Sequence, residues 1–256
     1  MTSPTPEQQS TALEEQMERL RTMTPADPAA LAAHRAEESG GAFKKLLAEA
    51  ALPALTLGVI EGGGVSVEGP FAAWGARRDR LRAALAKPPA LVVLGGPSSL
   101  GKTLMAVDAG VEFLKKGQRV RYVRLFDLME IYDAARSHPP DAELEFSTER
   151  EVSLWLLQPA LLLLDECDKV RESRYVLDKV FNAVEARREA RRRTVFVGNW
   201  DMAGFKDWAS MKGQVAHGPS LIHRLNREGG FMDFTRNDTL CRPADSEAGA
   251  QKGQPK

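Results

Sequence analysis

The sequence has 256 residues, 43% of them hydrophobic, which is enough for one α/β domain with an appendage or for two small domains. Its 35 basic and 35 acidic residues cancel, so the net charge excludes a general attraction to nucleic acid or to an anionic membrane. The two cysteines, Cys167 and Cys241, lie far apart and lack metal-ligand spacing, which argues against a zinc module or a disulfide framework.

The residues before position 60 predict a small helical region. A start rich in Pro, Ser, Thr and Gln precedes three stretches of helical composition, at about 13–20, 29–38 and 42–52. Glycine-rich residues 62–70 then lead to a helix over 71–86, which two prolines end. We place a domain boundary near residue 60 and assign residues 1–60 to a helical N-terminal region that binds a partner.

The stretch Leu91–Thr103 reads LVVLGGPSSLGKT and has the G-x-x-x-x-G-K-[ST] spacing of a P-loop. Residues 90–94 predict a short buried strand and residues 104–114 a helix, so the motif lies between a strand and a helix, as a P-loop requires. Glycines let the backbone curl and direct successive N–H groups at phosphate oxygens, and the helix N-terminus adds positive potential. The motif predicts that the chain binds a nucleoside triphosphate; the alternative is a glycine-rich turn with an incidental lysine.

Eight consecutive residues form this predicted phosphate site: Gly96, Pro97, Ser98, Ser99, Leu100, Gly101, Lys102 and Thr103. Within it, Lys102 is expected to reach the β- and γ-phosphates, and Thr103 to contact a magnesium ion.

Strands and helices alternate after the P-loop. Residues 118–125, QRVRYVRL, alternate basic and apolar side chains as a half-buried strand does, and residues 160–164 predict a fully apolar strand. The remaining elements are helices over 126–135, 149–157 and 173–190, a strand over 194–197, and short helices near Met202 and Leu221. This alternation predicts a parallel sheet with helices on both faces. We assign residues 61–242 to this domain and residues 243–256, which have no apolar face to bury, to a disordered tail.

The longest apolar stretch, around residues 156–164, is too short and too interrupted to span a bilayer, and the first ten residues are polar. We therefore expect a cytoplasmic protein that has no transmembrane helix and no contact with a membrane.

The string LLLLDE, residues 161–166, delivers two carboxylates to the carboxyl end of a buried parallel strand, the edge where ligands of α/β proteins bind. This pattern is typical of a Walker B motif. We expect Asp165 to hold the magnesium ion, directly or through water, and Glu166 to orient or deprotonate the water that attacks the γ-phosphate. The alternative is a strand end at which acidic residues simply meet solvent.

Two further residues are candidates for the reaction. Asn199 follows the strand over 194–197, so it is expected to position the water or to contact the γ-phosphate; alternatively, it caps the helix that starts near Asp201. Phosphoryl transfer also gains from a cation on the developing γ-phosphate charge. We select Arg224 for this role, with Arg227 as the substitute, against the alternative of a surface arginine on a packed helix.

Basic residues that are candidates for contact with single-stranded DNA cluster in two places. One cluster ends the long helix and the other follows the acidic motif; they are Arg187, Arg188, Arg191, Arg192 and Arg193, and Lys169, Arg171 and Arg174. Cations at the C-terminal end of a helix are also favoured by the helix dipole and by solvation, so the first cluster has an ordinary explanation.

The region of residues 92–242 resembles the AAA+ proteins of the DnaC and IstB group, which are replicative helicase loaders and transposition helper ATPases. Besides GPSSLGKT, the resemblance includes MAVDAGVEFLKKGQRVRYVRLFDLMEIY and LLLLDECDKVRESRYVLDKVFNAVEARREARRRTVFVGN. It implies a P-loop AAA+ ATPase core without a C-terminal lid domain. It also implies ATP and Mg²⁺ as cofactors, bound between the subunits of a homo-oligomer. Arg224, which precedes a Gly-Gly strand, would then act on the nucleotide of the adjacent subunit.

The chain departs from this family in two respects. The residues before Gly62 carry no metal ligands, and Val197-Gly198 stand where the family often has Thr-Ser before Asn199. From the resemblance we expect a helicase loader that contacts single-stranded DNA and a replicative DNA helicase and hydrolyses ATP. The alternative within the family is an IstB-type transposition helper that binds duplex DNA and a transposase. A small-molecule kinase and a nucleotide-binding scaffold without hydrolysis are the alternatives from other classes.

Overall fold

The computed structural model describes residues 41–53, 74–137, 146–170, 174–210, 217–234 and 240–241. The chain divides into two compact units, residues 1–44 and 45–256, and nearly all described residues belong to the second. Residues 41–50 are helical and overlap the stretch 42–52 for which the composition predicts a helix. The predicted domain boundary near residue 60, the helices predicted before residue 41 and the predicted tail lie outside the described residues.

A six-stranded sheet forms the centre of the second unit in the described part of the chain. Its strands are β1 (Ala90–Gly95), β2 (Val120–Arg124), β3 (Leu161–Asp165), β4 (Arg193–Val197), β5 (Gly229–Asp233) and β6 (Leu240–Cys241). The order is β2-β3-β4-β1-β5-β6, and only the last pair, β5 with β6, is antiparallel. The carboxyl ends of β1, β3 and β4 therefore meet at one edge.

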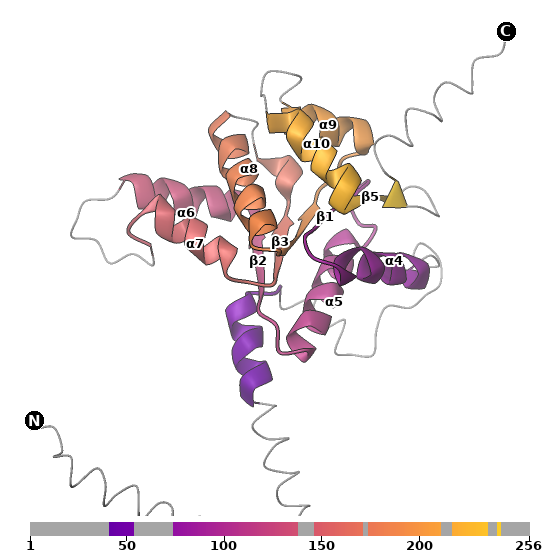
Figure 1. Cartoon of the computed structure of the whole chain (residues 1–256), viewed down its shortest axis with the longest axis horizontal. Helices are drawn as coiled ribbons and strands as arrows, with labels where there is room; N and C mark the ends of the chain where they lie inside the picture. The colour runs from indigo at the N-terminus through magenta and orange to yellow at the C-terminus, as the bar shows by residue number, and fades with distance from the viewer. Residues whose placement is uncertain are drawn as a thin grey trace, which may run out of the picture. The chain divides into compact units, whose positions relative to one another are not determined.

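The described helices are α4 (Trp74–Ala86), α5 (Lys102–Lys115), α6 (Leu125–Ser137), α7 (Glu149–Leu157), α8 (Arg174–Glu189), α9 (Met202–Ser210), α10 (His217–Glu228) and the short 3₁₀ helix η2 (Cys167–Lys169). Figure 1 shows α4 and α5 on one side of the sheet and α6 to α10 on the other. Strands β1 and β3 are buried along their whole length because helices cover both faces. The predicted parallel sheet with helices on both faces is confirmed. No helix in these ranges combines the length and the apolar character that crossing a bilayer requires.

Strand β5 begins with a glycine because no larger residue fits there. Gly229 lies opposite Leu91 of β1, and a Cβ atom at this position would overlap the backbone carbonyl of Leu91. The close approach of the two strands lets α10 end directly at the sheet.

Arg187 at the end of α8 is a structural residue. Its side chain is only 1% exposed, and its guanidinium donates hydrogen bonds to Thr194 Oγ1 at 3.0 Å and to the carbonyls of Leu156 at 2.5 Å, Pro159 at 3.1 Å and Arg193 at 2.6 Å. Burial lowers the pKa of Arg187 to about 9. Arg187 was one of the arginines considered for contact with DNA. In the structure it instead joins α8 to the starts of β3 and β4.

Candidate functional site

The loop between β1 and α5 has the backbone conformation that its glycines predict. Gly96 has a φ of 127° and Gly101 a φ of 80°, values that glycine adopts far more readily than other residues. Gly101 is the N-cap of α5, which begins at Lys102. The N-terminal N–H groups of this helix thus lie in the loop that is predicted to bind phosphate.

Phe234, which follows β5, supports this loop from a distant part of the chain. Its N–H donates to the Gly95 carbonyl at 2.9 Å, and a Cβ atom at Gly96 would come within 3.1 Å of the Phe234 side chain. Arg77 of α4 donates to the Phe234 carbonyl at 3.0 Å and lies 4.8 Å from the centre of its ring. The P-loop is therefore packed against Phe234 at the end of β5, and Arg77 of α4 in turn holds Phe234.

A cavity of about 400 Å³ opens at the carboxyl ends of β1, β3 and β4. It is lined by Ser98, Ser99, Gly101, Lys102, Thr103, Leu104, Asp165, Glu166, Lys169, Val197, Gly198 and Asn199. A larger cavity of about 800 Å³ lies among the C-terminal ends of α4, α8 and α10, but none of the P-loop residues lines it. The first cavity is the candidate nucleotide site because residues of the P-loop and of the acidic motif both line it.

Lys102 lies inside the loop with three oxygen acceptors around its amine. Nζ donates to the carbonyls of Gly96 at 2.8 Å and Pro97 at 2.5 Å, and to Asn199 Oδ1 at 3.0 Å. Burial lowers the pKa of Lys102, while the negative charges of Asp168 and Asp165 act in the opposite direction. These acidic residues thus favour the ammonium form that a phosphate site requires.

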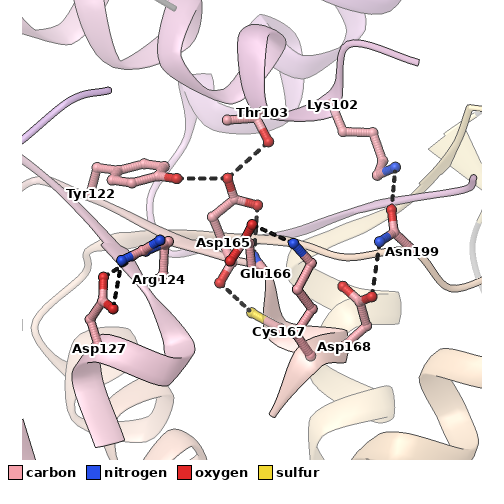
Figure 2. A network of polar contacts seen from close by, with 11 residues as sticks. Lys102, Thr103, Tyr122, Arg124, Asp127, Asp165, Glu166, Cys167, Asp168 and Asn199 are labelled. Atoms are coloured by element: carbon pink, nitrogen blue, oxygen red, sulfur yellow. Dashed lines mark hydrogen bonds and ion pairs between the residues drawn. The ribbon is translucent and has the colours of Figure 1, made fainter. Parts of the chain in front are cut away.

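Asp165 is held by three hydrogen bonds (Figure 2). Its Oδ2 atom accepts from Thr103 Oγ1 and from Tyr122 OH, both at 2.8 Å, and its Oδ1 atom accepts from the Glu166 N–H at 2.7 Å. Burial and the neighbouring carboxylate raise the pKa of Tyr122, so its hydroxyl remains a donor.

The oxygens of Thr103 and Asp165 fit Mg²⁺. This ion prefers hard oxygen ligands and is usually held by one or two carboxylates together with water and substrate phosphates. Within the described residues, no cluster of three acidic, His or Cys side chains could hold a metal by itself.

Glu166 has an unusual backbone conformation for a residue with a side chain, with φ 53° and ψ 32°. Such left-handed conformations are strained in non-glycine residues and cluster at functional sites. The turn leads into η2 and brings Lys169 back toward the cavity, where its Nζ lies 2.5 Å from Glu166 Oε1. This ion pair raises the pKa of Lys169.

Asn199 faces the cavity and does not cap the next helix. Its Nδ2 atom donates to Asp168 Oδ2 at 2.9 Å, and its Oδ1 atom accepts from Lys102, so the two partners define the orientation of the amide (Figure 2). The cap of α9 is provided by Asp201, whose Oδ1 accepts from the Gly204 N–H at 2.7 Å. The geometry thus favours the site role over the capping alternative.

Arg224 does not line this cavity. It lies on α10, where it forms an ion pair with Glu185 of α8, and its side chain is 22% exposed. The substitute candidate, Arg227, lines the larger cavity at the opposite edge of the sheet. The structure therefore brings together Lys102, Asp165 and Asn199 and leaves Arg224 apart from them.

The sequence analysis did not identify Tyr122 and Asp168 as site residues. Tyr122 belongs to an alternating strand, and it faces Asp165 only because β2 pairs with β3 in register, Tyr122 with Leu163 and Arg124 with Asp165. Asp168 lies three residues beyond Asp165, within one turn of chain, so a search of the residues after the Walker B motif would have found it.

The sequence matches the model of a protein family described as IstB-like ATP binding protein, over residues 84–238. This span contains every residue that lines the smaller cavity. No curated protein sequence matches the chain significantly.

Solved structures of replication proteins share the fold. AMPPCP-bound DnaA from Aquifex aeolicus is 16% identical with a TM-score of 0.52, over 80% of this chain and 58% of that chain. DnaI is 16% identical with a TM-score of 0.51, over 66% and 87%. DnaA bound to AMPPCP and single-stranded DNA is 18% identical with a TM-score of 0.51, over 72% and 50%. The chain spans little more than half of the DnaA chains. These findings confirm the predicted P-loop AAA+ fold and the predicted relation to the DnaC and IstB group.

Proposed function

The chain belongs to the family of IstB-like ATP-binding proteins, and we propose that it hydrolyses ATP to ADP and phosphate as a loader of a replicative DNA helicase. Hydrolysis is supported by one observation: the same cavity is lined by Lys102, Asp165 and Glu166. Asn199 also lines it and accepts a hydrogen bond from Lys102. A site that only bound nucleotide would not need a carboxylate next to the one that holds the metal.

The proposed reaction uses each of these residues. The loop N–H groups and Lys102 bind the β- and γ-phosphates, and Thr103 and Asp165 hold Mg²⁺. When bound with the nucleotide, Mg²⁺ neutralises charge on the phosphate oxygens. Glu166 orients the attacking water and accepts its proton, and Asn199 fixes the position of the water or of the γ-phosphate.

We propose that the site is completed by a second copy of the chain. Arg224 does not line the cavity of its own subunit, and its ion pair with Glu185 lies between the α8 and α10 helices. In a homo-oligomer, this guanidinium would contact the γ-phosphate bound to the neighbour and stabilise the charge that develops there.

We propose single-stranded DNA as the nucleic-acid ligand and residues 1–60 as the region that binds the helicase. Lys169 lines the nucleotide cavity and its side chain is 55% exposed, and Arg174 at the start of α8 is 85% exposed, so both are available to phosphates. The DnaA structure with single-stranded DNA supports this proposal at the level of the fold.

The second candidate is a transposition helper that binds duplex DNA and a transposase, and the IstB-like family match favours it.

Two assays distinguish the candidates. The first measures phosphate release by the full chain alone, with single-stranded DNA and with duplex DNA. The second probes pull-downs from the source cell for a helicase and for a transposase. Stimulation by single strands and capture of the helicase support the first candidate. Stimulation by duplex and capture of the transposase support the second. Absence of phosphate release without an acceptor substrate would contradict both and leave a kinase or a scaffold.

A further inference from the structure

Tyr122 of β2 hydrogen-bonds to the acidic motif through its side chain. Its hydroxyl is 2.8 Å from Asp165 Oδ2, the same oxygen that accepts from Thr103 Oγ1. A carboxylate oxygen has no hydrogen to give, so the phenol is the donor. Figure 2 shows Tyr122 and Thr103 approaching Asp165 from different directions.

The strand register makes this contact a fixed property of the sheet. Tyr122 pairs with Leu163 and Arg124 with Asp165, so Tyr122 and Asp165 point to the same face, one step apart along adjacent strands. That face is covered by α5, since a Cβ atom at Gly110 would lie 3.3 Å from both Leu163 and Val120. Thr103 belongs to the first turn of α5. The hydroxyl is therefore held between a strand and a helix and has little freedom to leave.

The hydrogen bonds of Asp165 act on both of its oxygens. The Glu166 N–H holds Oδ1 at 2.7 Å, and Oδ2 is shared by Thr103 and Tyr122. In the proposed reaction Thr103 turns its oxygen toward Mg²⁺. Tyr122 would then be the side chain that still fixes the rotation of the carboxylate, because it does not line the cavity and its hydroxyl keeps the bond to Oδ2.

We infer that Tyr122 is a positioning residue that orients Asp165 toward the magnesium ion of a bound nucleotide. This inference rests on the proposed function, since it assigns a role within the same site. Outer residues that hydrogen-bond to a metal ligand fix its geometry, and their loss typically lowers metal affinity about 10- to 100-fold. A tyrosine that only filled space in the sheet would have no such effect.

The test compares wild-type chain with Tyr122→Phe, which removes one oxygen atom and keeps the ring. The affinity for mant-ATP is measured by fluorescence in EDTA and again in saturating MgCl₂, and the ratio of the two dissociation constants reports how strongly Mg²⁺ and nucleotide favour each other. We expect this ratio to fall about tenfold in the variant. The affinity in EDTA should stay within about twofold, which also shows that the variant is folded.

Tyr132→Phe is the matched control. Tyr132 lies on α6, and its hydroxyl contacts Ser153 at 3.1 Å, away from the nucleotide cavity. The control should retain the wild-type ratio. Direct binding of Mn²⁺ in the presence of ADP, followed by EPR, gives a second readout that does not depend on turnover and should weaken only in Tyr122→Phe.

A measurement on the unsubstituted chain does not depend on the folding of a variant. The chain has three tyrosines, so 3-fluorotyrosine labelling gives three ¹⁹F resonances, and the Phe variants of Tyr132 and Tyr175 assign them by elimination. Addition of MgCl₂ to the nucleotide complex should shift the Tyr122 resonance alone.

Two results would overturn the inference and leave the ATPase proposal intact. One is a ratio of dissociation constants that is unchanged or increased in Tyr122→Phe, and the other is a Tyr122 resonance that does not move. Wild-type chain that fails to bind mant-ATP would overturn both.

Discussion

The side-chain amide of Asn199 donates to Asp168 at 2.9 Å while it accepts from Lys102 at 3.0 Å, so this residue after β4 joins the P-loop to the turn that follows the acidic motif. Asp168 also counteracts the effect of burial on Lys102, whose pKa is lowered from its ordinary value. The charge of the P-loop lysine therefore depends on a residue that belongs to neither motif.

This relationship predicts a change in the pH dependence of ATP binding. The ammonium form of Lys102 binds phosphate, so binding weakens as pH rises through the pKa of Lys102. Replacing Asp168 with Asn removes a charge that raises this pKa, and the pKa should fall further. We expect the alkaline loss of mant-ATP affinity to begin at lower pH in Asp168→Asn. The exposed Asp207→Asn on α9 should follow the wild-type curve, and coincident curves for all three proteins would contradict the prediction.

Glu166→Gln should separate binding from hydrolysis. The variant keeps the size of the side chain but cannot accept a proton, and general-base catalysis contributes about 10²- to 10⁴-fold. We expect phosphate release to fall about 100-fold or more, with mant-ATP affinity within about twofold of wild type. Glu189→Gln, at the exposed end of α8, serves as the control and should hydrolyse ATP normally. Normal turnover by Glu166→Gln would exclude it as the base.

Arg224→Ala should abolish hydrolysis without weakening ATP binding. An arginine that acts on the γ-phosphate contributes about 10³- to 10⁵-fold to the rate. Glu185→Gln breaks the same ion pair and keeps the guanidinium. It therefore separates a role of Arg224 in hydrolysis from a role in packing α10 on α8. We expect loss of turnover in Arg224→Ala and near-normal turnover in Glu185→Gln, both followed by phosphate release. Equal losses in the two variants would mean that Arg224 only stabilises the packing of α10 on α8.

Mixing two inactive variants tests whether Arg224 acts between subunits. A mixed oligomer of Glu166→Gln and Arg224→Ala contains interfaces at which one chain provides Glu166 and the other provides Arg224. Phosphate release by the mixture should exceed that of either variant alone and should disappear on dilution. A mixture as inactive as its components would argue for action within one chain.

Arg187→Ala should destabilise the fold. Four buried acceptors lose their donor, and we expect the free energy of unfolding to fall by about 3 kcal/mol, measured by urea denaturation. The adjacent Arg188, which pairs with Glu228 at 2.6 Å and is 38% exposed, is the control. Its replacement by Ala should cost about 1 kcal/mol or less, because partly exposed ion pairs contribute little. Equal losses would show that the two arginines have similar structural roles.

The sequence predicted the elements that have a strong pattern of their own. The apolar run at 160–164 corresponds to β3 at Leu161–Asp165, and the helix predicted over 104–114 corresponds to α5 at Lys102–Lys115. The burial of Arg187 could also have been predicted, because Arg187 continues the buried stripe of Val180 and Val184 along α8. We did not predict it because Arg187 belongs to a run of basic residues, which is typical of an exposed surface.

Contacts between distant strands could not be predicted from local pattern. The hydrogen bond from Tyr122 to Asp165 requires the register of β2 on β3. The alternation of QRVRYVRL predicts the two faces of β2 but not the strand that pairs with it. The ion pair of Arg224 with Glu185 likewise depends on how α10 packs on α8. The charge pattern of either helix alone does not determine that packing.

The contact of Phe234 with the P-loop sets the shortest fragment that can be used to study nucleotide binding. A chain cut after α10 keeps every residue assigned to the site but loses the Phe234 N–H that donates to Gly95 and the Phe234 Cβ atom that lies against Gly96. Such a fragment would bind ATP weakly for a reason unrelated to the motif itself. Proteolysis experiments that seek a minimal ATP-binding core should therefore retain the chain at least through Phe234 and, on the opposite side, from the start of α4.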